Sequence, residues 1–126
     1  MPPDRNGPGF VYLLGNKDGW YRIGRTANPV ERFRSRRWES MVNKHGLMPL
    51  FLLKVENQAH AEMFFHKLFD DKRTDARHNG MGPRHELFRL NSNDLATFLF
   101  FADLVAIKRW SLAGSWAVPD EVKDGI

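Results

Sequence analysis

The chain has 126 residues, of which 42% are hydrophobic and 13% aromatic, so one domain with its own apolar core is expected. Cysteine is absent, which excludes disulfide frameworks and thiolate metal sites and is typical of a reducing compartment. No run reaches the roughly 18 to 20 apolar residues that span a bilayer. The N-terminal residues also lack the apolar core of a signal peptide, so a cytoplasmic protein is expected.

Charge is distributed unevenly along the chain. The formal net charge is +4, but of the 19 Lys and Arg residues only Lys123 follows Trp110, whereas three of the 15 Asp and Glu residues do. Residues 1–110 therefore carry a net charge of +6, and the residues after them are acidic. A basic body indicates a polyanionic partner such as nucleic acid, and the alternative is a basic surface that serves solubility alone.

Two short strands joined by a tight turn are the first elements that the sequence predicts. Residues 1–8 are rich in Pro and Gly and are expected to be disordered. Residues 10–14 and 20–24 are runs of β-branched, aromatic and aliphatic side chains. Residues 16–19 between them read N-K-D-G, which is typical of a hairpin turn because the glycine can adopt a positive φ.

The hairpin register decides which side chains face each other. If Leu14 faces Trp20, then Tyr12 lies directly opposite Arg22, and directly opposed side chains are about 5 Å apart. A cation there would favour the phenolate form of Tyr12, which is the form that a general base requires. The pairing depends on this register, since a slip of one residue would move the two side chains to opposite faces.

A helix with several arginines is expected to follow the hairpin, over residues 29–42. Asn28 is a favourable N-cap, and Pro29 is favourable at the first helical position. Arg32 and Arg36 are four residues apart and share a face, which is either a phosphate-binding surface or a solvated basic face. The apolar stripe of this helix is Val30, Phe33, Trp38, Met41 and Val42. The candidate nucleic-acid-binding arginines of the region are Arg25, Arg36 and Arg37.

A third strand is predicted over residues 49–55, because this run is almost entirely apolar. A second helix begins at Asn57 or Gln58 and is expected to face the core with residues spaced three and four apart. Those core residues are Ala61, Phe64, Phe65 and Leu68. Glu62 and His66 are neighbours on another side of this helix, where they form either a catalytic pair or, more commonly, a structural one.

A polar loop with glycines and histidines is expected over residues 72–85, and it is either a mobile element that tracks phosphates or a plain surface connection. Glu86 begins a short strand over residues 86–90. A last helix, apolar nearly all round, is predicted from about Ser92 to Trp110, and its leftover apolar face is free to bind a partner. Residues 111–126 are expected to form a loosely packed tail. The candidate nucleic-acid-binding cations of the loop are Lys72, Arg73, Arg77 and Arg84.

In their order and spacing these features resemble the GIY-YIG nuclease superfamily, and most closely the small branch of phage and bacterial proteins whose second motif reads K-I-G or R-I-G. Each motif alone is weakly specific, but the ordered set is specific and spans about residues 9–105. The matching residues are Phe10-Val11-Tyr12, Arg22-Ile23-Gly24, Arg25-Thr26 with Asn28-Pro29, Arg32, Glu62 with His66, and Arg84-His85-Glu86-Leu87-Phe88.

The resemblance implies an α+β domain over residues 9–110. Its hairpin and a third strand, with a helix between them in the chain, would form a three-stranded antiparallel sheet flanked by about three helices. It also implies a one-metal phosphodiester hydrolase in which Tyr12 is the general base or orients the attacking water. Arg32 would stabilise charge on the phosphoryl group, and Arg22 takes the place of the second-motif tyrosine. Glu86 would be the only protein ligand of one Mg²⁺ or Mn²⁺ ion. His66 completes the catalytic residues that the resemblance implies.

Two functions from different classes are therefore expected. The leading hypothesis is a metal-dependent DNA endonuclease, whose specificity would come from the basic loop, from homodimerisation or from a protein partner. The alternative is a weakly active or inactive domain of the same type that binds nucleic acid or a protein. A zinc site is the third hypothesis, but its histidines match no compact zinc pattern. They are His60, His66, His78 and His85.

Overall fold

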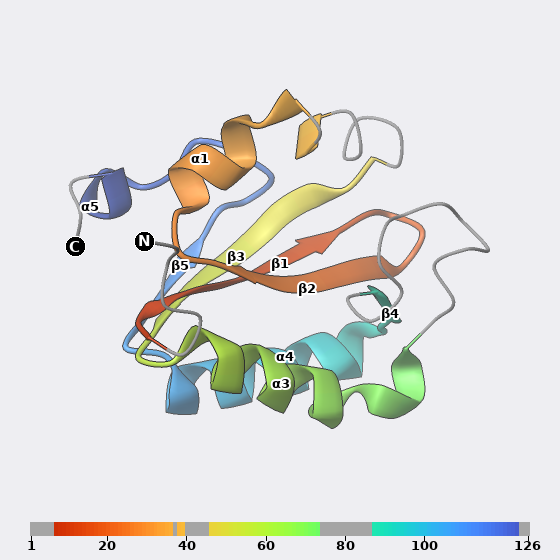
Figure 1. Cartoon of the computed structure of the whole chain (residues 1–126). Helices are drawn as coiled ribbons and strands as arrows, with labels where there is room; N and C mark the ends of the chain where they lie inside the picture. The colour runs from red at the N-terminus through yellow and green to blue at the C-terminus, as the bar shows by residue number, and fades with distance from the viewer. Residues whose placement is uncertain (1–6, 37, 40–45, 74–86, 124–126) are drawn as a thin grey trace.

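The computed structural model describes residues 7–36, 38–39, 46–73 and 87–123. They form an antiparallel five-stranded sheet of order β4-β2-β1-β3-β5, with helices packed on both faces (Figure 1). The strands are β1 (Gly9–Gly15), β2 (Trp20–Thr26), β3 (Met48–Val55), β4 (Leu87–Arg89) and β5 (Lys108–Ser111). The helices are α1 (Pro29–Arg34), α3 (Gln58–Leu68), a 3₁₀ turn (Asp70–Lys72), α4 (Ser92–Val105) and α5 (Asp120–Lys123).

The predicted three-stranded sheet is wrong, because β4 and β5 extend it at both edges. β4 pairs with β2, and β5 pairs with β3. β5 comes from a stretch that was predicted as the end of the last helix: α4 ends at Val105, and the Ile107 N–H donates to the Lys54 carbonyl at 2.7 Å. Without β5, the backbone N–H and C=O groups along one edge of β3 would be unpaired. Pairing with β3 therefore outweighs the helical preference of residues 108–110.

The turn between β1 and β2 is one residue shorter than its four-residue sequence signature. Asn16 and Trp20 close the loop, with the Asn16 N–H donating to the Trp20 carbonyl at 3.0 Å. Gly19 adopts a φ of 86°, as a three-residue hairpin loop requires. The Asn16 side chain also accepts hydrogen bonds from the backbone of Asp18 and Trp20.

This turn shifts the register by two residues from the predicted one. Tyr12 pairs with Gly24 and Leu14 pairs with Arg22, so the predicted direct opposition of Tyr12 and Arg22 is wrong. Because the shift is an even number of residues, Tyr12 and Arg22 stay on the same face of the sheet as diagonal neighbours.

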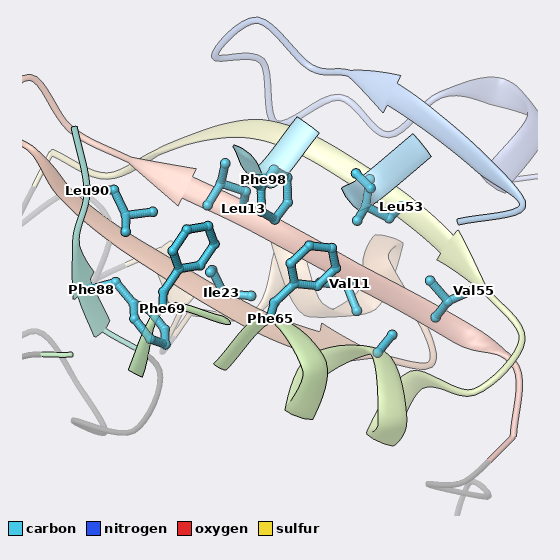
Figure 2. Packing of buried hydrophobic residues seen from close by; sticks show 12 residues of the cluster. Val11, Leu13, Ile23, Leu53, Val55, Phe65, Phe69, Phe88, Leu90 and Phe98 are labelled. Atoms are coloured by element: carbon cyan, nitrogen blue, oxygen red, sulfur yellow. The ribbon is translucent and has the colours of Figure 1, made fainter. Parts of the chain in front are cut away.

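The sheet has an apolar core on each face. On one face, side chains of β1, β2 and β3 pack against α3 and α4, where the rings of Phe65 and Phe98 lie 4.7 Å apart (Figure 2). The other face, here called the α1 face, packs against α1 and the segment that follows β5 (Figure 1). Its strand residues include Phe10, Tyr12 and Leu14, which alternate with the residues facing α3 and α4.

The segment after Trp110 is packed more tightly than the loose tail predicted from the sequence. Leu112, Val118 and Val122 are buried in the core of the α1 face. Trp116 packs edge-on against Phe33 of α1, with the ring centroids 5.2 Å apart. This segment therefore forms part of the layer that covers the α1 face.

The predicted helix over residues 29–42 is interrupted at Ser35. Asn28 caps α1 as expected, accepting from the Glu31 N–H at 3.1 Å, but α1 ends at Arg34 and Ser35 is extended, with ψ 142°. The Ser35 hydroxyl accepts from the Trp38 N–H at 3.2 Å, which begins a second helical stretch. Residues 40–42 lie outside the described part. In the described ranges, no helix is long and apolar enough to cross a membrane.

Candidate functional site

Tyr12 lies at the centre of the α1 face, on the middle strand of the sheet. Its side chain is fully buried and crosses over Gly24 of β2, its cross-strand partner. A Cβ atom at position 24 would collide with the Tyr12 hydroxyl and lie 2.9 Å from ring atom Cε1. Glycine is therefore required at this position so that the tyrosine can lie flat against the strand.

Trp38 packs against this tyrosine from the helical layer. Their ring centroids are 5.2 Å apart with an interplanar angle of 87°, which is the edge-to-face arrangement favoured by aromatic pairs. Phe33 of α1 stacks on Trp38 at 5.7 Å, and Trp116 meets it edge-on at 6.0 Å. The indole is thus held in place on three sides by rings from three separate segments.

Two arginines lie over the same indole. The Cζ atoms of Arg22 and Arg32 are 5.5 Å and 5.8 Å from the centre of the Trp38 ring, within cation–π range. Arg22 is buried with 5% exposure, whereas Arg32 is exposed on α1. The two guanidinium groups make this part of the α1 face cationic.

A buried hydrogen-bond donor completes the arrangement. Among the described residues, the Trp38 Nε1–H is buried and has no acceptor. An indole nitrogen can only donate, and leaving such a buried group unsatisfied costs about 1–3 kcal/mol. The two cations over this ring, of which Arg32 is exposed, make this surface suitable for an anionic ligand with oxygen acceptors. We call Arg22, Arg32 and Trp38 the cationic cluster.

The structure places His66 and Arg25 on the other face of the sheet. His66 is buried on α3, and its Nε2 donates to the Ile23 carbonyl at 2.8 Å. Arg25 forms an ion pair with Glu62 of α3, with Nε 3.2 Å from Oε1. These two predicted site residues are therefore separated from Tyr12 by the sheet.

The predicted nucleic-acid-binding cations are dispersed. Lys72 lies 3.9 Å from an Asp94 carboxylate oxygen, and Arg73 forms an isolated bridge with Phe88 beside β4. Arg36 is exposed just beyond α1. The other predicted site residues lie outside the described part, and they are Arg37, Arg77, Arg84 and Glu86.

Metal binding within the described part is limited by its carboxylates. In residues 7–36, 38–39, 46–73 and 87–123, no three His, Asp or Glu side chains gather as a metal site would need. The cationic cluster contributes positive charge and no carboxylate. The carboxylate predicted as the metal ligand, Glu86, lies outside the described residues.

Comparison with protein families gives a match over residues 9–105, to the T5orf172 domain. The chain belongs to the T5orf172 domain family. This domain occurs in nuclease-like proteins of phages and bacteria. The T5orf172 match ends at Val105, the last residue of α4, so β5 and the segment after it lie beyond the matched region. Comparisons with curated proteins and with solved structures found no match.

Trp38 is the site residue whose role the sequence does not reveal. In the sequence it is one member of an apolar stripe, whereas in the T5orf172 domain of this chain two guanidinium groups lie within cation–π range of its ring. Its only signal is its place directly after R-S-R-R, where an aromatic ring could stack against arginine.

Proposed function

We propose that this protein is a metal-dependent DNA endonuclease of the GIY-YIG type that binds the DNA backbone on its α1 face. The observation that carries the proposal is the cationic cluster beside Tyr12. A phosphate is the anion that best fits a surface with two arginines, because it offers several acceptor oxygens around one charge. Membership of a family found in nuclease-like proteins supports the same reading.

Each member of the site has a distinct proposed role. Arg32, which is exposed, contacts the phosphate first and stabilises the charge that develops on it. Arg22, which is buried, holds a fixed positive charge beneath it, at no cost of reorganisation during the reaction. Tyr12 removes a proton from the attacking water or orients that water.

Glu86 is the proposed ligand of one Mg²⁺ or Mn²⁺ ion. It directly precedes Leu87, the residue of β4 that pairs with Arg22. The metal would neutralise charge on the phosphate oxygens and on the leaving group. Arg36, Arg37, Arg77 and Arg84 are proposed to extend the contact along the DNA backbone.

The test is cleavage of supercoiled plasmid DNA in Mg²⁺ or Mn²⁺. We expect nicked or linear product with the wild type and none after addition of EDTA or with Glu86→Ala. Glu56→Ala is a suitable control, since Glu56 is an exposed glutamate between β3 and α3 and should leave cleavage unchanged. Undiminished cleavage by Glu86→Ala would contradict the metal-ligand assignment.

A DNA-binding domain without cleavage activity is the second candidate, and the burial of Tyr12 favours it. At 0% exposure, the hydroxyl is out of reach of a phosphodiester in this conformation. Binding would then rest on Arg32 and the other exposed cations. This candidate predicts DNA affinity that falls steeply with salt, with no cleavage in any divalent metal.

A further inference from the structure

An apolar patch lies on the side of the molecule formed by α3 and α4, away from the cationic cluster. Its most exposed members are Phe100, Leu104 and Ile107, with exposed fractions of 61%, 67% and 58%. Surface leucines and phenylalanines are common singly, but adjacent ones of this exposure are not. The apolar patch comprises Phe64, Phe100, Phe101, Leu104, Val105 and Ile107.

The patch is continuous across α3, α4 and Ile107, the residue that precedes β5. Phe64 of α3, Leu104 and Val105 of α4, and Ile107 line one shallow hollow. The Phe101 ring lies 5.4 Å from the Phe64 ring, and the Phe100 ring lies 5.2 Å from the Phe101 ring. α4 therefore carries apolar side chains on its outer side as well as towards the core, the pattern of a helix that is covered on both sides.

The area and charge of the patch fit a protein interface. Its side chains expose roughly 500 Å² in total, on the order of the largest patches seen on monomers. A standard interface buries about 800 Å² per partner, a little over half of it apolar, so the patch could supply the apolar part of one such interface. Asp103 lies at the rim of the patch and forms an ion pair with Arg109, whose Nε is 2.8 Å from the Asp103 Oδ1 atom. An apolar surface with a neutralised rim does not suit DNA.

We propose that the apolar patch is covered by a second copy of this chain, in a two-fold homodimer with α4 packed against α4 of the partner. A two-fold contact uses the same patch twice, so the apolar area is matched on both sides without a second binding surface. Glu56 lines the hollow and Lys67 lies near the end of α3, and both are exposed, so a two-fold arrangement can place opposite charges beside the patch.

The proposed dimer would leave both cationic clusters accessible. The patch lies mainly on α3 and α4, and α1 lies on the opposite face of the sheet (Figure 1). Trp38 belongs to the core of that α1 face, and Arg22 and Arg32 lie over its ring. The two clusters would therefore face away from each other. Each copy would contact its own stretch of nucleic acid, and the dimer as a whole could hold two stretches.

The test is the mass of the full-length protein in solution, by sedimentation equilibrium over a range of concentrations. We expect a dimer with a dissociation constant in the micromolar range or tighter. Phe100→Glu and Leu104→Glu should each weaken it by about 30-fold or more, with unchanged circular dichroism, because both side chains are exposed. Met48→Glu is the matched control, as Met48 is 48% exposed at the start of β3 and is not part of the patch.

Cross-linking gives a second readout that does not depend on how the glutamate variants fold. The chain has no cysteine, so Phe100→Cys introduces a single thiol, which should form a disulfide-linked dimer on oxidation. Met48→Cys should form no disulfide-linked dimer under the same conditions, because position 48 lies outside the patch. A wild-type protein that is monomeric at about 100 μM would overturn the proposal. So would a dimer that persists in both glutamate variants. Neither readout uses cleavage, so the result is independent of the proposed nuclease activity.

Discussion

Gly24 and Tyr12 show how one residue without a side chain determines the position of another. The tyrosine ring occupies the space where any other residue at position 24 would place its Cβ atom. The sequence shows the R-I-G triplet but not its reason, because the reason lies in a cross-strand pair two residues away from the predicted one. Trp38 shows the same limit, since its place beside two arginines depends on the break at Ser35.

Gly24→Ala should destabilise the fold by about 1–3 kcal/mol, the usual cost of forcing extra volume into a packed site. In a Tyr12→Leu background the same change should cost less, because the clashing ring atoms are gone. Denaturant unfolding of the two single variants and the double variant measures this coupling. Strictly additive free energies of unfolding would contradict the contact.

Arg32→Ala should weaken DNA binding with little change in the melting temperature, because its guanidinium is exposed and its cation–π contact with Trp38 is worth only about 0.5–1 kcal/mol. The slope of log affinity against log salt should fall by about 1, as expected for one lost phosphate contact. Arg109→Ala is the control, as Arg109 is an exposed arginine paired with Asp103 beside the apolar patch. An equal loss of affinity in both variants would place DNA elsewhere on the molecule.

At the scale of elements, the sequence predicts most of the fold wherever local chemistry decides. The sequence predicts the hairpin, β3, the N-cap Asn28 and the start of α3 at Asn57 or Gln58; α3 begins at Gln58 with Asn57 as its N-cap. The elements that it misses depend on distant partners. β5 has the sequence of a helix end and becomes a strand because β3 needs an edge partner, and the three-residue turn changes a register that pattern alone leaves open.

The two caps allow a matched comparison. Asn28 accepts from the Glu31 N–H at 3.1 Å, and Asn57 accepts from the His60 N–H at 3.0 Å. Replacing either by Ala should cost about 1 kcal/mol of stability, measured by thermal unfolding. Only Asn28→Ala should also weaken DNA binding, because α1 carries Arg32. If Asn57→Ala weakened DNA binding as much as Asn28→Ala does, the proposed contact between α1 and DNA would be contradicted.

The molecule as a whole extends beyond the region that defines its family. The T5orf172 match stops at Val105, but β5 completes the sheet and Trp116 packs on the ring of Trp38. Residues 106–123 are therefore part of the folded domain. They also hold the indole around which the cationic cluster is arranged.

This C-terminal layer should respond to acid. Hydrogen bonds donated by Lys108 and by the Trp110 indole lower the pKa of Glu121 below its usual value. A folded-state pKa below the unfolded one means that ionised Glu121 favours the folded state at neutral pH, and this contribution is lost as pH falls through the folded pKa. In Lys108→Met the titration midpoint of Glu121, followed by NMR, should rise, whereas Lys123→Met should leave it unchanged. A midpoint unaffected by Lys108→Met would contradict the pairing.

The most direct test of the proposed function is to measure cleavage and DNA binding together in Tyr12→Phe. The variant keeps the ring that packs on Gly24 and Trp38 and removes only the hydroxyl. If Tyr12 is the general base, cleavage in Mg²⁺ or Mn²⁺ should fall by a factor of about 100 or more while DNA affinity and melting temperature stay close to wild type. Cleavage by Tyr12→Phe at the wild-type rate would contradict the account.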